Sequence, residues 1–132
     1  MIGKTLGRYR VLEKIGRGGM GEVFLAEDTS LHRRVALKFL PPEMQQDEEA
    51  HRRFIREARS AAALDHPHIC HINEVAESEG CDFIVMEYVD GQALRAKIGQ
   101  GPIALEETLR IGVEVTEALE AAHGKGIVHR DI

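Results

Sequence analysis

Five segments of the chain carry the alternating or mostly apolar residues that are typical of β-strands. They are Tyr9–Ile15, Glu22–Asp28, Arg33–Leu40, His68–Glu77 and Asp82–Tyr88. Turn-forming residues separate most of these segments, including a glycine-rich stretch after the first and Ser78-Glu79-Gly80 between the last two. The pattern therefore predicts five strands, with a hairpin across the glycine-rich stretch.

Helical spacing of apolar residues appears in three places. The first helix is expected to begin at an acidic cap, Asp47-Glu48-Glu49, and to reach about Leu64. Its apolar stripe consists of Ala50, Phe54, Ala58 and Ala61. A short helix is predicted at Leu94–Ile98 and a long one at about Leu105–His123. The predicted strands, with one helix inserted among them, are followed by a helical part, so the fold class is α+β.

The stretch Gly16-Arg17-Gly18-Gly19-Met20-Gly21 has glycines at its first, third and sixth positions. A backbone without side chains can approach a phosphate closely at such a turn. In a Rossmann-type oxidoreductase the last glycine opens a helix, whereas here Glu22–Asp28 has a strand pattern. That class of enzyme is therefore excluded, although the stretch alone also fits a flexible hairpin.

A single cation stands in the otherwise aliphatic run Val35-Ala36-Leu37-Lys38. A lysine buried in a strand needs an anion close by, because burial of an unpaired charge is costly. Lys38 therefore changes the interpretation of the glycine stretch, since both features suit a phosphate.

The glycine stretch with Val23 two residues on, the strand residue Lys38, and His129-Arg130-Asp131 follow one another in the order found in protein kinases. The chain resembles that family over nearly all of its length. The sequences Gly-Arg-Gly-Gly-Met-Gly and His-Pro-His-Ile (residues 66–69) most resemble the corresponding loops of bacterial Hanks-type serine/threonine kinases.

The resemblance implies the N-terminal half of a kinase catalytic domain. Residues 1–8 would be a lead-in, and residues 9–89 the small lobe, with the five-stranded antiparallel sheet and one packed helix. Residues 90–132 would be the hinge and the first helices of the large lobe, cut just after the His-Arg-Asp motif.

Site residues follow from the same resemblance, which implies transfer of the ATP γ-phosphate to a serine or threonine hydroxyl of a protein substrate. Asp131 would accept the proton of the hydroxyl, and Lys38, held by Glu57, would contact the α- and β-phosphates. The backbone of Glu87 and Val89 would meet the adenine edge. The expected ATP-binding residues are Ile15, Gly16, Arg17, Gly18, Gly19, Met20, Gly21, Glu22, Val23, Ala36, Lys38, Met86, Glu87 and Val89.

Some of these residues also have ordinary structural explanations. Glu57 could be a solvated helix residue paired with a nearby arginine such as Arg53. The stretch from Met86 to Val89 could simply end an edge strand. The histidines and the cysteine of residues 66–71 could in principle bind a metal, but their spacing is not a standard zinc pattern, and no metal site is predicted.

In the family, the residues that hold magnesium follow the catalytic aspartate, and the sequence given stops one residue after Asp131. Mg²⁺ is therefore expected as a cofactor only of a complete domain, and the 132-residue chain alone is expected to be inactive. The alternative is a non-catalytic module that binds a nucleotide or a partner.

Composition narrows the choice of partners. The chain has 17 basic and 22 acidic residues and a net charge of -5, which disfavours nucleic acid as a partner. No signal peptide or membrane-length apolar run is present, so a cytoplasmic location is expected, with Cys70 and Cys81 reduced. The apolar side of the helix at Leu105–His123 makes self-association an expectation.

Overall fold

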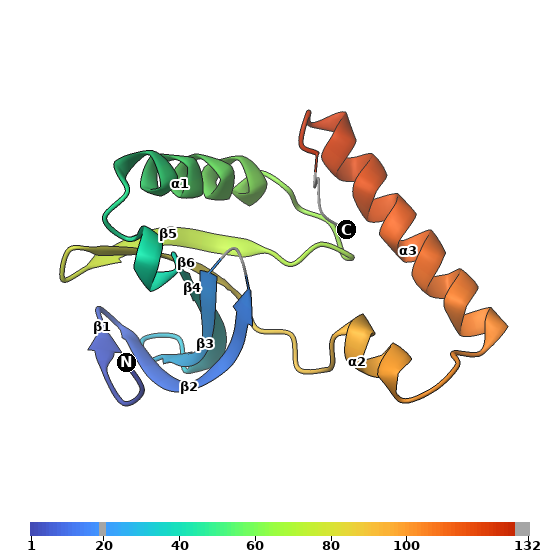
Figure 1. Cartoon of the computed structure of the whole chain (residues 1–132), viewed down its shortest axis with the longest axis horizontal. Helices are drawn as coiled ribbons and strands as arrows, with labels where there is room; N and C mark the ends of the chain where they lie inside the picture. Colours follow the sequence, from blue (N-terminus) through green and yellow to red (C-terminus); the bar gives the residue numbers. More distant parts are fainter. Residues whose placement is uncertain (19–20, 129–132) are drawn as a thin grey trace. The chain divides into compact units, whose positions relative to one another are not determined.

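The structure is a computed structural model of the 132-residue chain, and it describes residues 1–18 and 21–128 (Figure 1). The chain divides into two compact units. The first unit contains Met1–Ala63 and His71–Tyr88. The second contains Leu64–Cys70 and the described residues from Val89 onward.

One antiparallel sheet dominates the first unit, as the sequence predicts. In the described residues it has six strands, in the order β1-β2-β3-β4-β6-β5. Their bounds are β1 (Thr5–Leu6), β2 (Tyr9–Gly18), β3 (Gly21–Asp28), β4 (Arg33–Phe39), β5 (Ile72–Ser78) and β6 (Cys81–Glu87). Each neighbouring pair is antiparallel, so short turns join most consecutive strands. The predicted α+β small-lobe fold is confirmed.

The strands differ from the predicted ones by more than one residue in three places. The lead-in contains β1, a two-residue strand that pairs with the start of β2 through Thr5 and Arg10. The second strand extends three residues further than predicted, because its pairing with β3 continues to Gly18. β5 begins at Ile72 instead of His68, since the N–H groups of His68 and Ile69 bond back to His66 in a turn.

Alternate residues of the strands point to opposite faces of the sheet, and one face forms the core. The buried core cluster consists of Leu6, Tyr9, Val11, Phe24, Ala26, Val35, Leu37, Phe39, Phe83 and Val85. The ring centroids of Phe39 and Phe83 lie 5.4 Å apart, and those of Phe24 and Phe39 lie 5.7 Å apart. Burial of each such ring contributes about 1.5–3 kcal/mol, so these three rings are a main source of stability.

Asp28 is a carboxylate buried completely at the end of β3. Its Oδ1 accepts hydrogen bonds from the N–H groups of Ser30 and Leu31, at 3.0 and 3.1 Å, and its Oδ2 lies 3.3 Å from Arg8 Nε. Desolvation opposes the charged form, but these hydrogen bonds and Arg8 outweigh it and lower the pKa of Asp28. The ionised carboxylate therefore fixes the turn between β3 and β4.

Tyr9 forms a second polar anchor, because its hydroxyl donates a hydrogen bond to the carboxylate of Glu74. Desolvation and this hydrogen bond raise the pKa of Tyr9 to about 12. The contact ties the start of β2 to β5, two strands that lie at distant positions in the sheet order.

Helix α1 (Glu48–Ala62) follows a single 3-10 turn, η1 (Pro42–Met44). Asp47 is its N-cap, as predicted, and the carboxylate accepts hydrogen bonds from the N–H groups of Glu49 and Ala50. The helix packs against β5, and Figure 1 shows it lying along that strand. Ala50 and Ala58 of the predicted apolar stripe are buried.

The second unit consists mainly of α2 (Leu94–Gly99) and α3 (Leu105–Gly124), both close to their predicted bounds. A salt bridge between Lys97 and Glu107 joins the two helices. His68 Nε2 lies 3.5 Å from a carboxylate oxygen of Glu117, which connects the turn after α1 to α3. Neither α3 nor any other helix within residues 1–18 and 21–128 has the length and apolar character needed to cross a bilayer.

Candidate functional site

The sheet pairing brings several predicted site residues into one row. Gly16 pairs with Val23, Val23 pairs with Lys38, and Lys38 pairs with Ile84. Residues opposite one another on antiparallel strands share a face, so the side chains of this row lie on the face opposite the core cluster. The glycine stretch and the strand lysine, distant in sequence, are therefore neighbours.

Lys38 is half-buried on this face. Desolvation lowers the pKa of its ammonium group, and the negative charge of Glu57 partly offsets that effect by raising it. The ammonium makes no direct ion pair or hydrogen bond with any residue that the structure describes. The strand thus holds a partly desolvated cation that a phosphate could neutralise.

Glu57 lies on α1 and is exposed to solvent. The negative charge of Glu57 raises the pKa of Lys38, although the two side chains do not form a direct salt bridge. Because α1 packs on β5, the carboxylate is carried by a helix at the β5 edge of the sheet. Neither Arg53 nor its neighbour Arg56 makes an ion pair with Glu57, so the local pairing considered above is not observed.

Gly16 and Gly21 of the turn differ in whether the fold requires a glycine there. Gly21 has φ +135°, and a Cβ built on it would lie 1.9 Å from the carbonyl oxygen of Phe39. The close approach of β3 to β4 therefore requires glycine at this position. A Cβ on Gly16 would meet only the Cβ of Val23, at 3.8 Å, so the fold alone does not require Gly16.

Other residues of the turn are only partly described. The backbone of Arg17 and Gly18 continues β2, whereas Gly19 and Met20 lie outside the described residues. Glu22 pairs with Lys14 at 3.1 Å, which holds β3 to β2 just beyond the turn. The side chain of Ile15 is 42% exposed, so it is available to a ligand at the mouth of the turn.

The predicted adenine-contacting residues divide between the two units. Ala36 pairs with Met86 across β4 and β6, on the same face as Lys38. The N–H of Glu87 donates to the carbonyl of His71, and a carboxylate oxygen of Glu87 accepts from the N–H of His71. Val89 belongs to the second unit and is 66% exposed.

Sequence reasoning missed two residues of this face. Ile84 pairs directly with Lys38, and Leu25 pairs with Ala36; both are buried. They stand two positions from Met86 and Val23, so strict alternation along each strand would have identified them.

Asp131 lies outside the described residues, so its predicted catalytic role stays a prediction. Within residues 1–18 and 21–128, no group of three His, Cys, Asp or Glu side chains is placed to hold a metal ion. In the described part of the chain, the features that suit a phosphate are therefore Lys38 and the nearby glycine turn.

Comparisons with known proteins agree on one family. The family model described as "Protein kinase domain" matches residues 9–132. Serine/threonine-protein kinase PrkC of Bacillus subtilis is 47% identical over 134 residues, which cover 100% of this chain and 21% of PrkC. Probable serine/threonine-protein kinase PknB of Lactococcus lactis is 46% identical over 134 residues, which cover 99% of this chain and 21% of PknB.

A solved structure gives the same result. The crystal structure of the Mycobacterium tuberculosis PknI kinase domain matches with a TM-score of 0.82 and 37% sequence identity. The match covers 100% of this chain and 54% of that one. The chain therefore spans only a minor part of the curated relatives and about half of the solved kinase domain.

Proposed function

The chain belongs to the protein kinase domain family, whose model matches residues 9–132, and we propose that it forms the ATP-binding part of a serine/threonine protein kinase. Such an enzyme transfers the γ-phosphate of ATP to a protein hydroxyl. The observation that carries the proposal is Lys38, a half-buried cation on a strand face with no direct anionic partner among the described residues. The serine/threonine preference rests on the relatives' names.

Lys38 would hold the α- and β-phosphates. Burial lowers the pKa of its ammonium, which means that the folded chain disfavours the charged form until an anion approaches. The phosphates of ATP would supply that anion, so nucleotide binding would relieve the desolvation cost. Glu57 supports the same charge from α1 and would orient the ammonium once the two side chains meet.

Gly16 supports a ligand role for the turn. The fold leaves ordinary space around a Cβ at this position, so packing does not explain the absence of a side chain. A bare backbone would, however, let the nucleotide phosphates approach the strand closely. Gly21 is different, because packing against Phe39 is sufficient to explain it.

The apolar neighbours of Lys38 would contact the adenine ring. Val23, Ala36 and Met86 share the face on which Lys38 lies. Aliphatic and thioether groups of this kind suit the flat face of a base, and the backbone of Glu87 and Val89 would read its edge. These contacts are assigned by resemblance to the family.

Asp131 would accept the proton of the substrate hydroxyl. Magnesium belongs to the chemistry of the family, where it neutralises charge on the β- and γ-phosphates. The described residues offer no group of carboxylates to hold it, so no step is assigned to it in this chain. We expect the 132-residue chain by itself to transfer phosphate at least about three orders of magnitude more slowly than a complete domain. As a user of ATP, the protein is expected to act in the cytoplasm.

A second candidate is nucleotide binding without phosphate transfer. It is favoured by one observation, namely that Lys38 and Glu57 do not form a direct salt bridge. Phosphate transfer and nucleotide binding can be measured separately, so one experiment distinguishes the two functions.

The test is a chimera in which this chain replaces the matched 134 residues of PrkC. We expect it to place phosphate on serine or threonine of a generic protein substrate, detected by mass spectrometry. Lys38→Met and Asp131→Asn should each reduce the rate by roughly three orders of magnitude or more. A chimera that binds ATP but transfers no phosphate supports the second candidate. Parental rates in the Lys38→Met variant would disprove the role of Lys38.

A further inference from the structure

A pair of hydrogen bonds joins the end of β6 to the residue that precedes β5. The N–H of Glu87 donates to the main-chain carbonyl of His71, and the N–H of His71 donates to a carboxylate oxygen of Glu87, each at 2.9 Å. Ile72 pairs with Met86, so His71 and Glu87, one residue further out on each strand, face one another across the antiparallel ladder. Both residues belong to the first compact unit.

This rung departs from the regular antiparallel pattern. In a hydrogen-bonded antiparallel pair, each residue donates its N–H to the main-chain carbonyl of the other. The N–H of Glu87 follows that pattern, whereas the N–H of His71 donates to the side chain of Glu87. The carboxylate therefore takes the place that the carbonyl of the same residue has in a regular rung.

The rung also determines how the chain leaves the sheet. β6 ends at Glu87, so the bonds to His71 orient the peptide that follows the last residue of the strand. The proposed function assigns the backbone of this residue to the adenine edge of ATP. The direction of the Glu87 carbonyl would then decide whether it meets the base.

We propose that the carboxylate of Glu87 is a positioning group for adenine: by accepting the N–H of His71, it lets the main-chain carbonyl of Glu87 point to the adenine edge. This inference rests on the proposed function, since it needs ATP as the ligand. The amino group of adenine donates a hydrogen bond, whereas guanine has an accepting oxygen at the corresponding place. A carbonyl held at this edge therefore favours ATP over GTP.

Stabilisation of the strand end alone is the competing explanation, because the carboxylate satisfies a backbone N–H. The bond between His71 and Glu87 is, however, exposed to solvent. Water can replace an exposed acceptor at little cost to the free energy of unfolding, since only a buried N–H left without a partner is costly. Exposure therefore favours a role in orientation over a role in stability.

The test compares two ligands that share a triphosphate and differ in the base. Isothermal titration calorimetry with the 132-residue chain measures the binding of ATP and of inorganic tripolyphosphate, which has no adenine. Glu87→Met removes the acceptor at a similar side-chain length, so it should weaken ATP binding by about fivefold or more. Its affinity for tripolyphosphate should stay within about twofold of the parental value. The preference for ATP over GTP should fall in the same variant.

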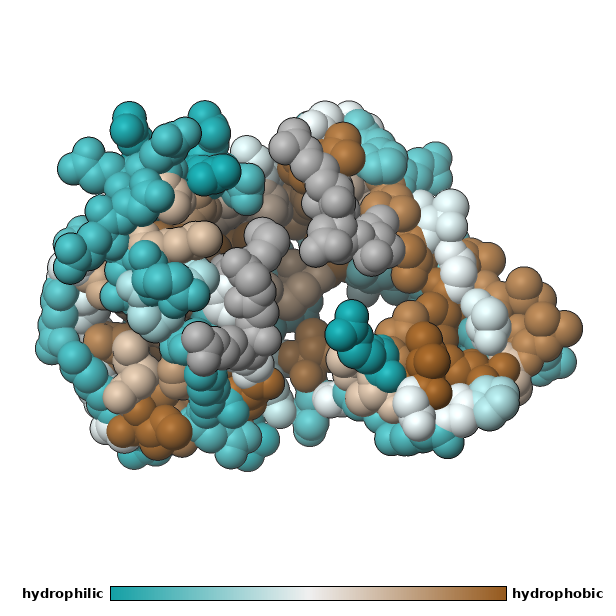
Figure 2. All heavy atoms as spheres, viewed as in Figure 1, coloured by the Kyte–Doolittle hydropathy of each residue, from teal (hydrophilic) through white to brown (hydrophobic). Residues whose placement is uncertain are grey.

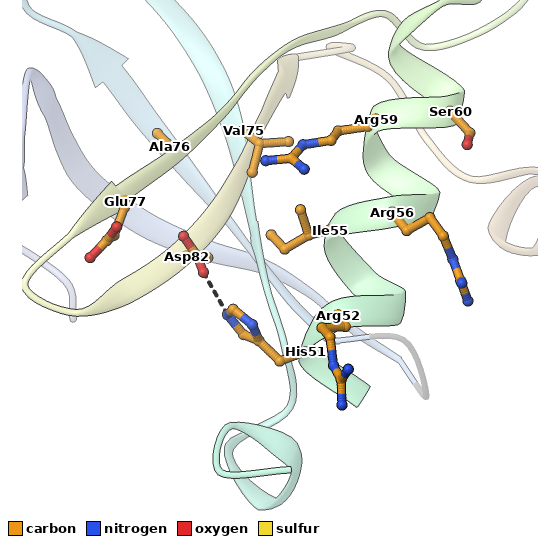
Figure 3. Close-up of a pocket in the computed structure, with 10 residues that line it drawn as sticks. All are labelled: His51, Arg52, Ile55, Arg56, Arg59, Ser60, Val75, Ala76, Glu77 and Asp82. Atoms are coloured by element: carbon orange, nitrogen blue, oxygen red, sulfur yellow. Dashed lines mark ion pairs between the residues drawn. The ribbon is translucent and has the colours of Figure 1, made fainter. Parts of the chain in front are cut away.

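Two further variants are matched controls. Glu87→Gln removes the charge but keeps an oxygen that can accept the N–H of His71, so it should bind ATP within about twofold of the parent. Glu77→Met removes the same charge near the other end of β5, beside Asp82 (Figure 3), and should change the affinity for either ligand by less than about twofold. If Glu87→Met unfolds at a lower temperature than the parent, Glu87→Asp replaces it, because the shorter side chain keeps the charge but loses the reach.

Three results would overturn the inference while the proposed function stands. Parental ATP binding in Glu87→Met would mean that the carboxylate does not position the carbonyl. An equal loss for ATP and tripolyphosphate would mean that the bond only supports the fold. An equal loss in Glu87→Gln and Glu87→Met would mean that the charge matters and the hydrogen bond does not. A parent chain that binds neither ligand would contradict the proposed function, and this inference with it.

Discussion

At Lys38, burial within a strand and the need for a charged ammonium oppose one another. Its position within β4 removes part of its hydration, while its proposed function, to hold the phosphates of ATP, needs the ammonium to stay charged. Among the described residues, no carboxylate contacts the ammonium directly, so part of the electrostatic cost remains. A site of this kind gives up stability in return for affinity toward an anion.

This cost predicts a specific dependence of stability on pH. Because burial lowers the pKa of Lys38 below 10.5, the unfolded chain binds more protons in the interval between the two values. The contribution of Lys38 to the free energy of unfolding therefore rises with pH through that interval. Lys38→Met should stabilise the chain at neutral pH, and its advantage should shrink as the pH approaches 10.5.

Urea unfolding of the parent and of Lys38→Met across this pH range measures the difference. Lys4→Met, at a residue that pairs with Glu79 on the surface, serves as the control. A stability difference that stays constant or grows with pH would contradict the expected desolvation of Lys38.

Gly16 and Gly21 form a matched pair for a second test. Gly16→Ala should leave the free energy of unfolding unchanged or raise it by up to about 1 kcal/mol, because the position has room for a methyl group. Gly21→Ala should lower it by more than about 1 kcal/mol, since the new Cβ would clash with the Phe39 carbonyl at a positive φ. Only Gly16→Ala should weaken ATP binding without loss of stability. Equal destabilisation by both variants would remove the argument that Gly16 is kept for a ligand.

Residues of the site were predictable to different degrees. That Lys38, Ala36 and Met86 share one face of the sheet could be predicted, because strands alternate regularly. Asp28 could not, because its burial depends on Arg8 and on the turn after β3, which no local pattern reveals. The pairing of Ile84 with Lys38 depends on the strand register, which the sequence alone does not define.

Helix α1 carries Glu57, whose negative charge acts on Lys38. Its start was predictable from the acidic cap, since Asp47 is followed by two glutamates that favour the positive end of the helix dipole. The start of β5 was not predictable, because the turn after Pro67 uses the side chain of His66 as a hydrogen-bond acceptor.

The cap of α1 provides a direct prediction. Asp47→Ala removes two hydrogen bonds to backbone N–H groups and should lower the free energy of unfolding by about 1 kcal/mol. Asp47→Asn keeps an acceptor oxygen and should cost less. Chemical unfolding followed by circular dichroism measures both variants. If the two variants unfold alike, at the parental midpoint, the cap does not stabilise α1.

At the scale of the whole molecule, the second unit leaves much apolar surface in contact with solvent. Leu105, Leu109 and Val113 follow one another at intervals of four residues on α3, and they are 73%, 60% and 56% exposed. Figure 2 shows apolar residues gathered over this helix on the face that it displays. The helix was predictable from its spacing, because periodicity identifies an apolar side irrespective of what covers it.

We therefore expect the isolated 132-residue chain to bind a hydrophobic dye or to self-associate. Leu109→Glu with Val113→Glu should reduce dye fluorescence and shift the chain toward monomer in size-exclusion chromatography, because charges interrupt the apolar stripe. A parent chain that is monomeric and dye-silent would refute this account of α3.

We propose that Lys38 lies beside the phosphates of bound ATP. An ATP analogue with a reactive acyl group on its terminal phosphate transfers that group to a lysine amine next to the phosphates. Mass spectrometry of the labelled chain and of the PrkC chimera should find the acyl group on Lys38, and excess ATP should suppress this labelling. Labelling of the other lysines, Lys4, Lys14, Lys97 and Lys125, should not respond to ATP. A Lys38 that stays unlabelled, or whose labelling ATP does not suppress, would contradict the claim.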